Sequence, residues 1–190
     1  MFTNMNQIKF ATTNDYKIKF ANNLLNKHGW EVVPFDVELI EPQSMTQEDI
    51  SRFKVKQAYE KAQEPIITMD SGLFINALNG FPGIYTSDMF KTLSQEQFLK
   101  LLEDKTDNTA YIQQTLSYAD KNGIQAFSSK STGIIVPIDE MKEGYAFDAF
   151  FKVDSTGKLM TDMSEDEKGL IWGKAWGDLA EFLNKKQLKK

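Results

Sequence analysis

The sequence contains no cysteine and only one histidine. Without cysteine, the chain can form neither structural disulfides nor a zinc site built from thiolates, and its redox compartment stays open. The single histidine, His28, cannot supply a multi-histidine metal site. Its position before Gly29, at the end of a predicted helix, indicates a residue of the helix-capping region.

The sequence also lacks an apolar run long enough to span a membrane, and no apolar signal segment follows the N-terminus. Its net charge is −5, from 22 basic and 27 acidic residues. This balance argues against general nucleic-acid binding. We therefore expect a soluble, cytoplasmic protein with neither nucleic acid nor membrane as partner. The 190 residues are 41% hydrophobic, which suits a single domain over 1–190 without a separable linker.

The order of predicted elements favours an α/β fold with a mixed sheet. Short strands are predicted at 8–12, 31–35 and 66–69, and Asn14, Thr46 and Ser94 are good first caps for three helices. Asn122-Gly123 predicts a hairpin within the strand-rich stretch 110–138. Residues 145–153 form a further strand or strand-loop region, and a final helix carries Trp176, Leu179, Phe182 and Leu183. Side chains expected to face the core include Ile50, Phe53, Ala58, Tyr59, Ala62, Phe98, Leu101 and Leu102.

The most informative stretch reads D-S-G-L-F-I-N-A-L-N-G-F-P-G-I-Y, from Asp70 to Tyr85. Asp70 follows the apolar pair Ile66-Ile67 and precedes Ser71 and Gly72. An acid exposed at the end of a buried strand, with backbone free to approach a ligand, is a common element of metal-assisted phosphate sites. The simpler interpretation is a turn residue after a strand.

Residues 11–17 link the first strand to the first helix and read A-T-T-N-D-Y-K. Such a junction directs backbone N–H groups and the positive end of a helix toward one point. Thr12 and Asn14 add short polar side chains, and Lys17 adds a cation one turn into the helix. The segment is either a phosphate cradle or an ordinary capped helix, and it lacks the Walker A pattern.

Other charged residues have both a functional and a simpler interpretation. Pro42 holds Glu41 in an extended conformation, so that its carboxylate projects from a strand end or is merely solvated. Lys54 and Lys168 are surface lysines unless a ligand lies near them. Asp148 lies among aromatic residues, where it either hydrogen-bonds a stacked base or marks a strand edge.

Taken together, four blocks resemble the inosine triphosphate pyrophosphatase family, in the same order and over most of the chain. The Thr12–Lys17 segment resembles the family's T-G-N-x-x-K loop, and Glu41-Pro42-Gln43 resembles the loop of a metal-binding glutamate. The stretch Asp70–Tyr85 matches the signature D-S-G-L…A-L-x-G-x-P-G-x-Y closely. Tyr145-Ala146-Phe147-Asp148 is similar to the base pocket. The resemblance implies a two-lobed fold with a long twisted mixed sheet, helices beside it and the active site in the cleft between the lobes.

The resemblance also implies an activity, Mg²⁺-dependent hydrolysis of a deaminated or other non-standard purine nucleoside triphosphate to monophosphate and pyrophosphate, and a homodimer. Asp70 would be the catalytic carboxylate and would hold Mg²⁺ together with Glu41. The residues implied in substrate binding are Thr12, Asn14, Lys17, Lys54, Ser71, Tyr145, Phe147, Asp148, Lys168 and Lys174. Phosphoryl transfer depends mainly on charge neutralisation and alignment, which these residue types supply.

Several positions depart from the family pattern. Thr13 replaces the loop glycine, Phe20 and Met69 replace acids, and Ala146 replaces a glycine. Trp172-Gly173-Lys174 stands where relatives carry Ser-His-Arg, so that the base-contacting histidine and arginine are missing. Two alternatives therefore stay open, a nucleotide-binding protein with reduced catalysis and the same hydrolysis on a different base. Trp172 would then either stack on that base or pack, with Trp176, in the core.

Overall fold

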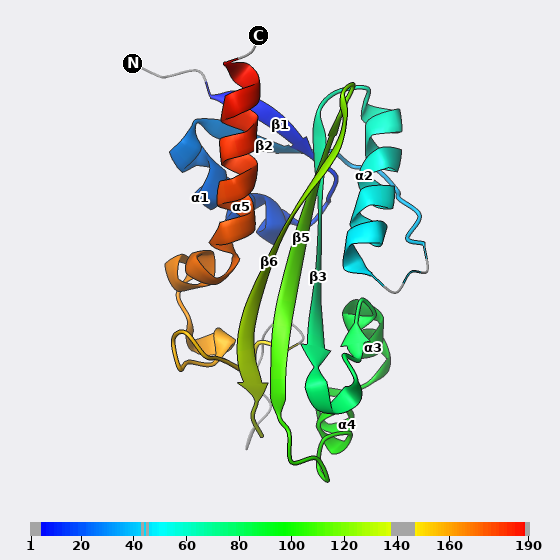
Figure 1. The fold of residues 1–190 in the computed structure, drawn as a ribbon, viewed down its shortest axis with the longest axis vertical. Helices are drawn as coiled ribbons and strands as arrows, with labels where there is room; N and C mark the ends of the chain where they lie inside the picture. Colours follow the sequence, from blue (N-terminus) through cyan, green and yellow to red (C-terminus); the bar gives the residue numbers. More distant parts are fainter. Residues whose placement is uncertain (1–4, 43, 45, 138–146, 189–190) are drawn as a thin grey trace. The chain divides into compact units, whose positions relative to one another are not determined.

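The computed structural model describes residues 5–42, 44, 46–137 and 147–188, and the chain divides into two compact units. Unit 1 comprises residues 1–70, 115–129 and 172–190, and unit 2 comprises residues 71–114 and 130–171. Four elements contribute residues to both units (Figure 1): β3 (Ile66–Ile75), β5 (Thr109–Asp120), β6 (Gly123–Ile135) and α5 (Glu165–Gln187).

The strands form one mixed sheet in the order β2–β1–β3–β5–β6–β7, with β4 paired to β3. The parallel strands are β1 (Asn6–Phe10), β2 (Trp30–Pro34) and β3, with Ile8 opposite Val32. The short strands β4 (Pro82–Gly83) and β7 (Phe151–Val153) are antiparallel to β3 and β6. The predicted α/β class with a mixed sheet is therefore confirmed.

Helices cover both faces of the sheet in unit 1 (Figure 1). On one face lie α1 (Asp15–Leu25) and the C-terminal part of α5, where Trp176 meets the Phe10 ring edge-on at 6.1 Å. On the other face lies α2 (Gln47–Ala62), whose Val55 and Ala58 pack with Ile66. The packing of α2 on this face brings Lys54 to Asp70, the last residue of β3 in this unit.

The helices α1 and α2 begin directly after the capping residues that the sequence predicts. Asn14 caps α1 and accepts a hydrogen bond from the Lys17 N–H, and Thr46 caps α2 in the same way through Asp49. Gly29 then follows the short 3₁₀ turn at 26–28 with a φ of 83°, a left-handed conformation that glycine adopts without strain.

Unit 2 contains two short helices, α3 (Thr86–Thr92) and α4 (Gln95–Lys100), with the predicted capping box at Ser94 and Gln97. Its core is aromatic, because the Phe98 ring lies 5.2 Å from Phe90 and 5.1 Å from Phe150. The hairpin predicted at Asn122-Gly123 joins β5 to β6, in unit 1.

Two side chains expected in the core are exposed instead. Phe53 is 45% exposed, because α2 turns Ser51 and Val55 to the sheet and Phe53 lies roughly 200° away from both around the helix. Leu101 is 39% exposed, because α4 ends one residue before it.

Trp172 and Trp176 pack in the core, which is one of the two interpretations that the sequence leaves open. Trp172 is 9% exposed and Trp176 is 1% exposed, both within unit 1. A buried indole offers little surface for stacking on a base, so the structure favours packing for Trp172.

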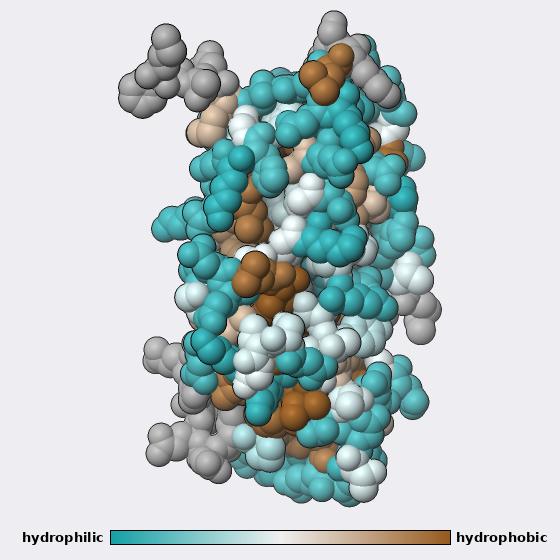
Figure 2. Space-filling model, turned by 60° about the vertical axis from the view of Figure 1, so that its left-hand side comes forward, coloured by the Kyte–Doolittle hydropathy of each residue, from teal (hydrophilic) through white to brown (hydrophobic). Residues whose placement is uncertain are grey.

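The face shown in Figure 2 is mainly hydrophilic, and its hydrophobic side chains form small separate patches. Single exposed apolar residues such as Leu170 and Leu188 are normal on protein surfaces. No helix in the described part of the chain combines the length and the apolar character that crossing a bilayer requires.

Candidate functional site

The segment between β1 and α1 is shaped by its own polar side chains. The Asn14 N–H donates to Thr12 Oγ1 at 3.2 Å, and Asn14 Oδ1 accepts from the Lys17 N–H at 3.2 Å. These bonds hold the loop against the N-terminus of an eleven-residue helix. The N-terminal N–H groups of the helix and its dipole favour an anion at this point.

Lys17 extends from the first turn of α1 and is half-buried. Burial lowers the pKa of its ammonium group, and the charges of Asp70 and Glu41 offset this effect only in part. Among the described residues, Lys17 forms no ion pair with either carboxylate, so it interacts with them only through space. A partly desolvated cation of this kind is well suited to receive a phosphate oxygen.

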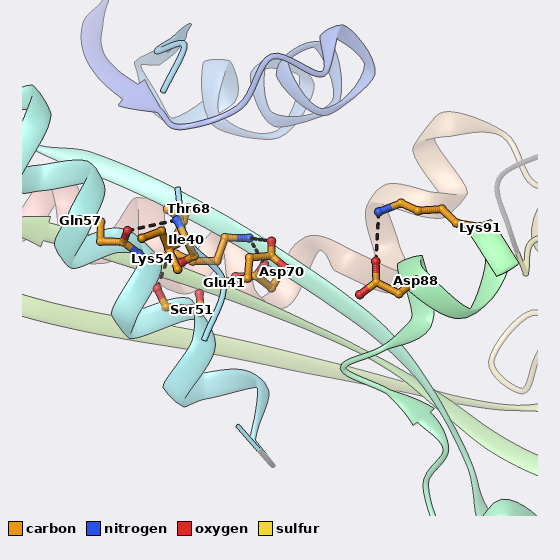
Figure 3. A network of polar contacts seen from close by, with 9 residues as sticks. All are labelled: Ile40, Glu41, Ser51, Lys54, Gln57, Thr68, Asp70, Asp88 and Lys91. Atoms are coloured by element: carbon orange, nitrogen blue, oxygen red, sulfur yellow. Dashed lines mark hydrogen bonds and ion pairs between the residues drawn. The ribbon is translucent and has the colours of Figure 1, made fainter. Parts of the chain in front are cut away.

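Lys54 bridges the two acids that the sequence predicts at the site (Figure 3). Its Nζ lies 2.6 Å from Glu41 Oε1 and 2.6 Å from Asp70 Oδ1. The side chains of Lys54 and Asp70 are 13% and 16% exposed, whereas that of Glu41 is 64% exposed. Burial alone would lower the pKa of Lys54, but the charge and hydrogen bonds of Asp70 and Glu41 raise it overall. The ammonium group is thus held in its charged form.

Three hydrogen bonds between side chains and backbone hold this arrangement. Gln57 makes two of them, and it is not among the residues predicted from the sequence. Gln57 donates from Nε2 to the Ile40 carbonyl at 2.7 Å and accepts from the Ile40 N–H at 3.1 Å, which ties the Glu41 loop to α2. Thr68 Oγ1 donates to the Ser51 carbonyl at 3.3 Å and joins β3 to the same helix. The only sequence signal for Gln57 is its spacing of three residues from Lys54, which places both on one helix face.

Asp70 lies within β3 rather than at its end, so the expectation of an acid after the strand is wrong. The strand continues to Ile75, because β4 pairs with it at Leu73 and Phe74. Side chains alternate along a strand, so Ser71 and Asp70 point to opposite faces. Asp70 can therefore face Lys54 while Ser71 does not.

The two carboxylates fit a hard divalent cation. Asp70 Oδ2 is buried and has no hydrogen-bond partner, which leaves one acceptor oxygen available beside Glu41. Within the described ranges, no three acidic or histidine side chains gather as a metal cage. Mg²⁺ is commonly held by one or two carboxylates plus phosphate oxygens and water, and this set matches that mode.

The residues predicted to contact the base divide between the two units. In unit 2, Asp148 is buried and its Oδ2 lies 3.4 Å from Lys168 Nζ, on the first turn of α5. Burial raises the pKa of Asp148, although Lys168 acts in the opposite direction. Phe147 is 2% exposed and packs edge-on against Phe151 at 6.5 Å, so its ring offers little surface for stacking in this arrangement. Tyr145 lies outside the described residues.

Lys174, in unit 1, is a surface residue of α5. It pairs with Asp178 at 2.8 Å and its side chain is 73% exposed. This is an ordinary i,i+4 pair on a helix. The structure therefore brings together Thr12, Asn14, Lys17, Glu41, Lys54 and Asp70 in unit 1, and separately Phe147, Asp148 and Lys168 in unit 2.

The chain is similar over nearly its whole length to proteins of one family. The sequence profile of the Ham1 family matches residues 8–182. The dITP/XTP pyrophosphatase of Hyperthermus butylicus is 35% identical over 93% of this chain and 94% of its own length. That of Pyrococcus horikoshii is 32% identical over 93% and 96%.

Solved structures show the same fold. The Ham1 protein of Staphylococcus aureus superposes with a TM-score of 0.81 at 26% identity, over 95% of this chain and 100% of that one. The Ham1 protein of Coxiella burnetii gives a TM-score of 0.83 at 26% identity, over the same shares. The resemblance found in the sequence is thus confirmed, and the chain belongs to the Ham1 family.

Proposed function

We propose that this chain is a Mg²⁺-dependent nucleoside triphosphate pyrophosphatase acting on a deaminated or otherwise non-standard purine nucleotide. The single observation that carries the proposal is Asp70, a mostly buried carboxylate with one oxygen held by Lys54 and the other unpaired, in the same unit as Glu41 and Lys17. The names of its relatives, dITP/XTP pyrophosphatases, support the same reaction class.

The triphosphate would be bound by the N-terminus of α1 and by two lysines. The hydroxyl of Thr12 and the amide NH₂ of Asn14 can donate, since their oxygens are the atoms used within the loop. Lys17 and Lys54 supply positive charge. A contact from Ser71 rests on the family resemblance alone, since its side chain points to the face of β3 opposite to Asp70. Charge neutralisation and alignment of this kind are the main requirements of phosphoryl transfer.

Glu41 and Asp70 would hold Mg²⁺, which when bound neutralises charge on the phosphate oxygens. Asp70 would also accept a hydrogen bond from the attacking water, orient it and take its proton. The water oxygen bonds to phosphorus as the bond between the α- and β-phosphates breaks. The products are the nucleoside monophosphate and pyrophosphate.

By the family resemblance, Asp148, Lys168 and Tyr145 would supply contacts to the base and phosphates, whereas stacking by Phe147 would require its buried ring to become exposed. Lys174 is the one cation that remains where relatives carry Ser-His-Arg. A site that lacks specific donors for a purine carbonyl discriminates less strongly among bases. The preferred base is therefore the part of this proposal that a nucleotide panel must decide.

We also propose a single domain over residues 1–190 that works as a homodimer in the cytoplasm, without nucleic acid. The family resemblance supports the dimer, and the net charge of −5 argues against nucleic-acid binding. Light scattering tests the dimer directly. A monomer across micromolar concentrations would refute that part.

The test is pyrophosphate release from a panel of nucleoside triphosphates with Mg²⁺, for the wild type and Asp70→Asn. A lost general base costs about 10²–10⁴-fold in turnover, and we expect a loss in that range. Asp88→Asn is the matched control, because the Asp88 carboxylate forms an exposed surface pair with Lys91 (Figure 3).

Two outcomes would contradict the enzymatic proposal. If Asp70→Asn turns over as fast as Asp88→Asn, the carboxylate is not catalytic. If every nucleotide binds saturably and none is hydrolysed, the chain is a nucleotide-binding protein that has lost catalysis.

A further inference from the structure

The position of Lys54 suggests more than a phosphate contact. Its ammonium group lies between Glu41 and Asp70 at 2.6 Å from an oxygen of each, so both carboxylates share one cation supplied by the protein itself. Lys54 and Asp70 are mostly buried, so solvent screens this interaction less than it screens a surface pair.

A divalent cation bound to the same two carboxylates would need nearly the same position. Two cationic centres held a few ångströms apart in a partly buried site repel each other strongly. Either Lys54 leaves the carboxylates or the metal binds them weakly. Lys54 has a flexible side chain of four methylene groups, so it can turn to a new anion without movement of α2.

We propose that Lys54 is an internal counter-ion that competes with the divalent cation for Glu41 and Asp70. An incoming triphosphate releases the carboxylates by drawing the Lys54 ammonium to its own oxygens. This inference rests on the proposed metal-dependent function. It adds that the free protein binds metal poorly and that the metal and the triphosphate favour each other's binding, a coupling that is reciprocal by thermodynamic necessity.

The experiment measures Mn²⁺ binding without nucleotide, by electron paramagnetic resonance of the free ion. Removing the competing charge in Lys54→Gln should tighten Mn²⁺ binding by about tenfold or more, since a unit charge a few ångströms away is worth that much at moderate dielectric. Lys54→Arg keeps the charge and should bind Mn²⁺ as weakly as the wild type.

Two further variants separate direct competition from a general field effect. Lys17→Gln removes a nearby cation that touches neither carboxylate, and it should tighten Mn²⁺ binding less than Lys54→Gln does. Lys56→Gln removes an exposed charge two residues along α2 and should leave the affinity unchanged.

Thermal unfolding supplies a second measurement that does not depend on turnover. Without metal, Lys54→Gln should unfold at a lower temperature than the wild type, because it leaves Asp70 without its counter-ion. Added Mn²⁺ should raise the Tm of Lys54→Gln more than that of the wild type, because ligand stabilisation follows affinity.

The outcomes are distinct. Equal or weaker Mn²⁺ binding by Lys54→Gln would overturn the counter-ion role, while pyrophosphate release in the nucleotide panel would leave the proposed function standing. Equal tightening by Lys17→Gln would show a general field effect and would also overturn it. Absence of Mn²⁺ binding in every variant would refute the two-carboxylate metal site, and with it the competition.

Discussion

Replacing Gly72 by alanine should destabilise the protein strongly, although Gly72 is an unstrained strand residue. A Cβ atom built on Gly72 would lie 2.4 Å from the Gly83 carbonyl oxygen and 3.1 Å from its carbon. Real Cβ atoms essentially never approach other atoms within 3.0 Å. The sequence suggests that this glycine leaves room for a ligand. In the structure, the space beside it is filled by the backbone of β4.

The magnitude follows from what must move. The obstructing atoms belong to the backbone at Gly83, which pairs with Leu73, so relief requires that β4 shift away from β3. Overpacking of this kind costs about 1–3 kcal/mol, and we expect the upper end because no flexible side chain can yield. For a chain of this length, 3 kcal/mol lowers the Tm by about 6–12 °C.

Urea and thermal unfolding measure the effect, and Gly173→Ala is the matched control. The same added methyl group at Gly173, within α5, meets no atom within 4 Å. It should raise the free energy of unfolding by about 0.5–1 kcal/mol, since alanine favours the helix and restricts the unfolded chain. If Gly72→Ala is as stable as the wild type, the close approach of β4 to β3 is wrong.

Two further predictions concern the polar contacts of the site. Lys168→Met should cost about 3 kcal/mol in unfolding free energy because it leaves the buried Asp148 without a counter-ion, whereas the double variant with Asp148→Asn should recover most of that loss. Additive losses in urea unfolding would contradict this coupling. Asn14→Ala should cost about 1 kcal/mol by removing the cap of α1, whereas Asn14→Ser should cost little. Equal unfolding midpoints for alanine and serine at this position would show that the cap contributes nothing.

Local chemistry explains why much of unit 1 is predictable from the sequence. The caps at Asn14 and Thr46 bond to backbone groups three residues away, and the stop at Gly29 needs only one residue with positive φ. None of these features depends on distant packing. The hairpin at Asn122-Gly123 is local in the same sense.

Failures of prediction occur where packing overrides a local pattern. Asp-Ser-Gly fits a turn, yet it lies within β3 because β4, which begins at Pro82, pairs with the strand beyond it. Phe53 looks like a core residue, yet α2 buries the polar Ser51 in its place. Local sequence propensity favours some conformations over others, but packing between distant segments decides which one forms.

The sequence by itself determined the family, the α/β class and the helix starts, and it predicted the residue types of a phosphate and metal site, because signature and caps are short-range patterns. Only the tertiary structure decided that Lys54 bridges Glu41 and Asp70, since those contacts span 13 and 16 residues and require α2 to pack on β3. It likewise decided that Trp172 lies in the core. Contacts between segments distant in the sequence depend on how whole elements pack, and no local pattern encodes that.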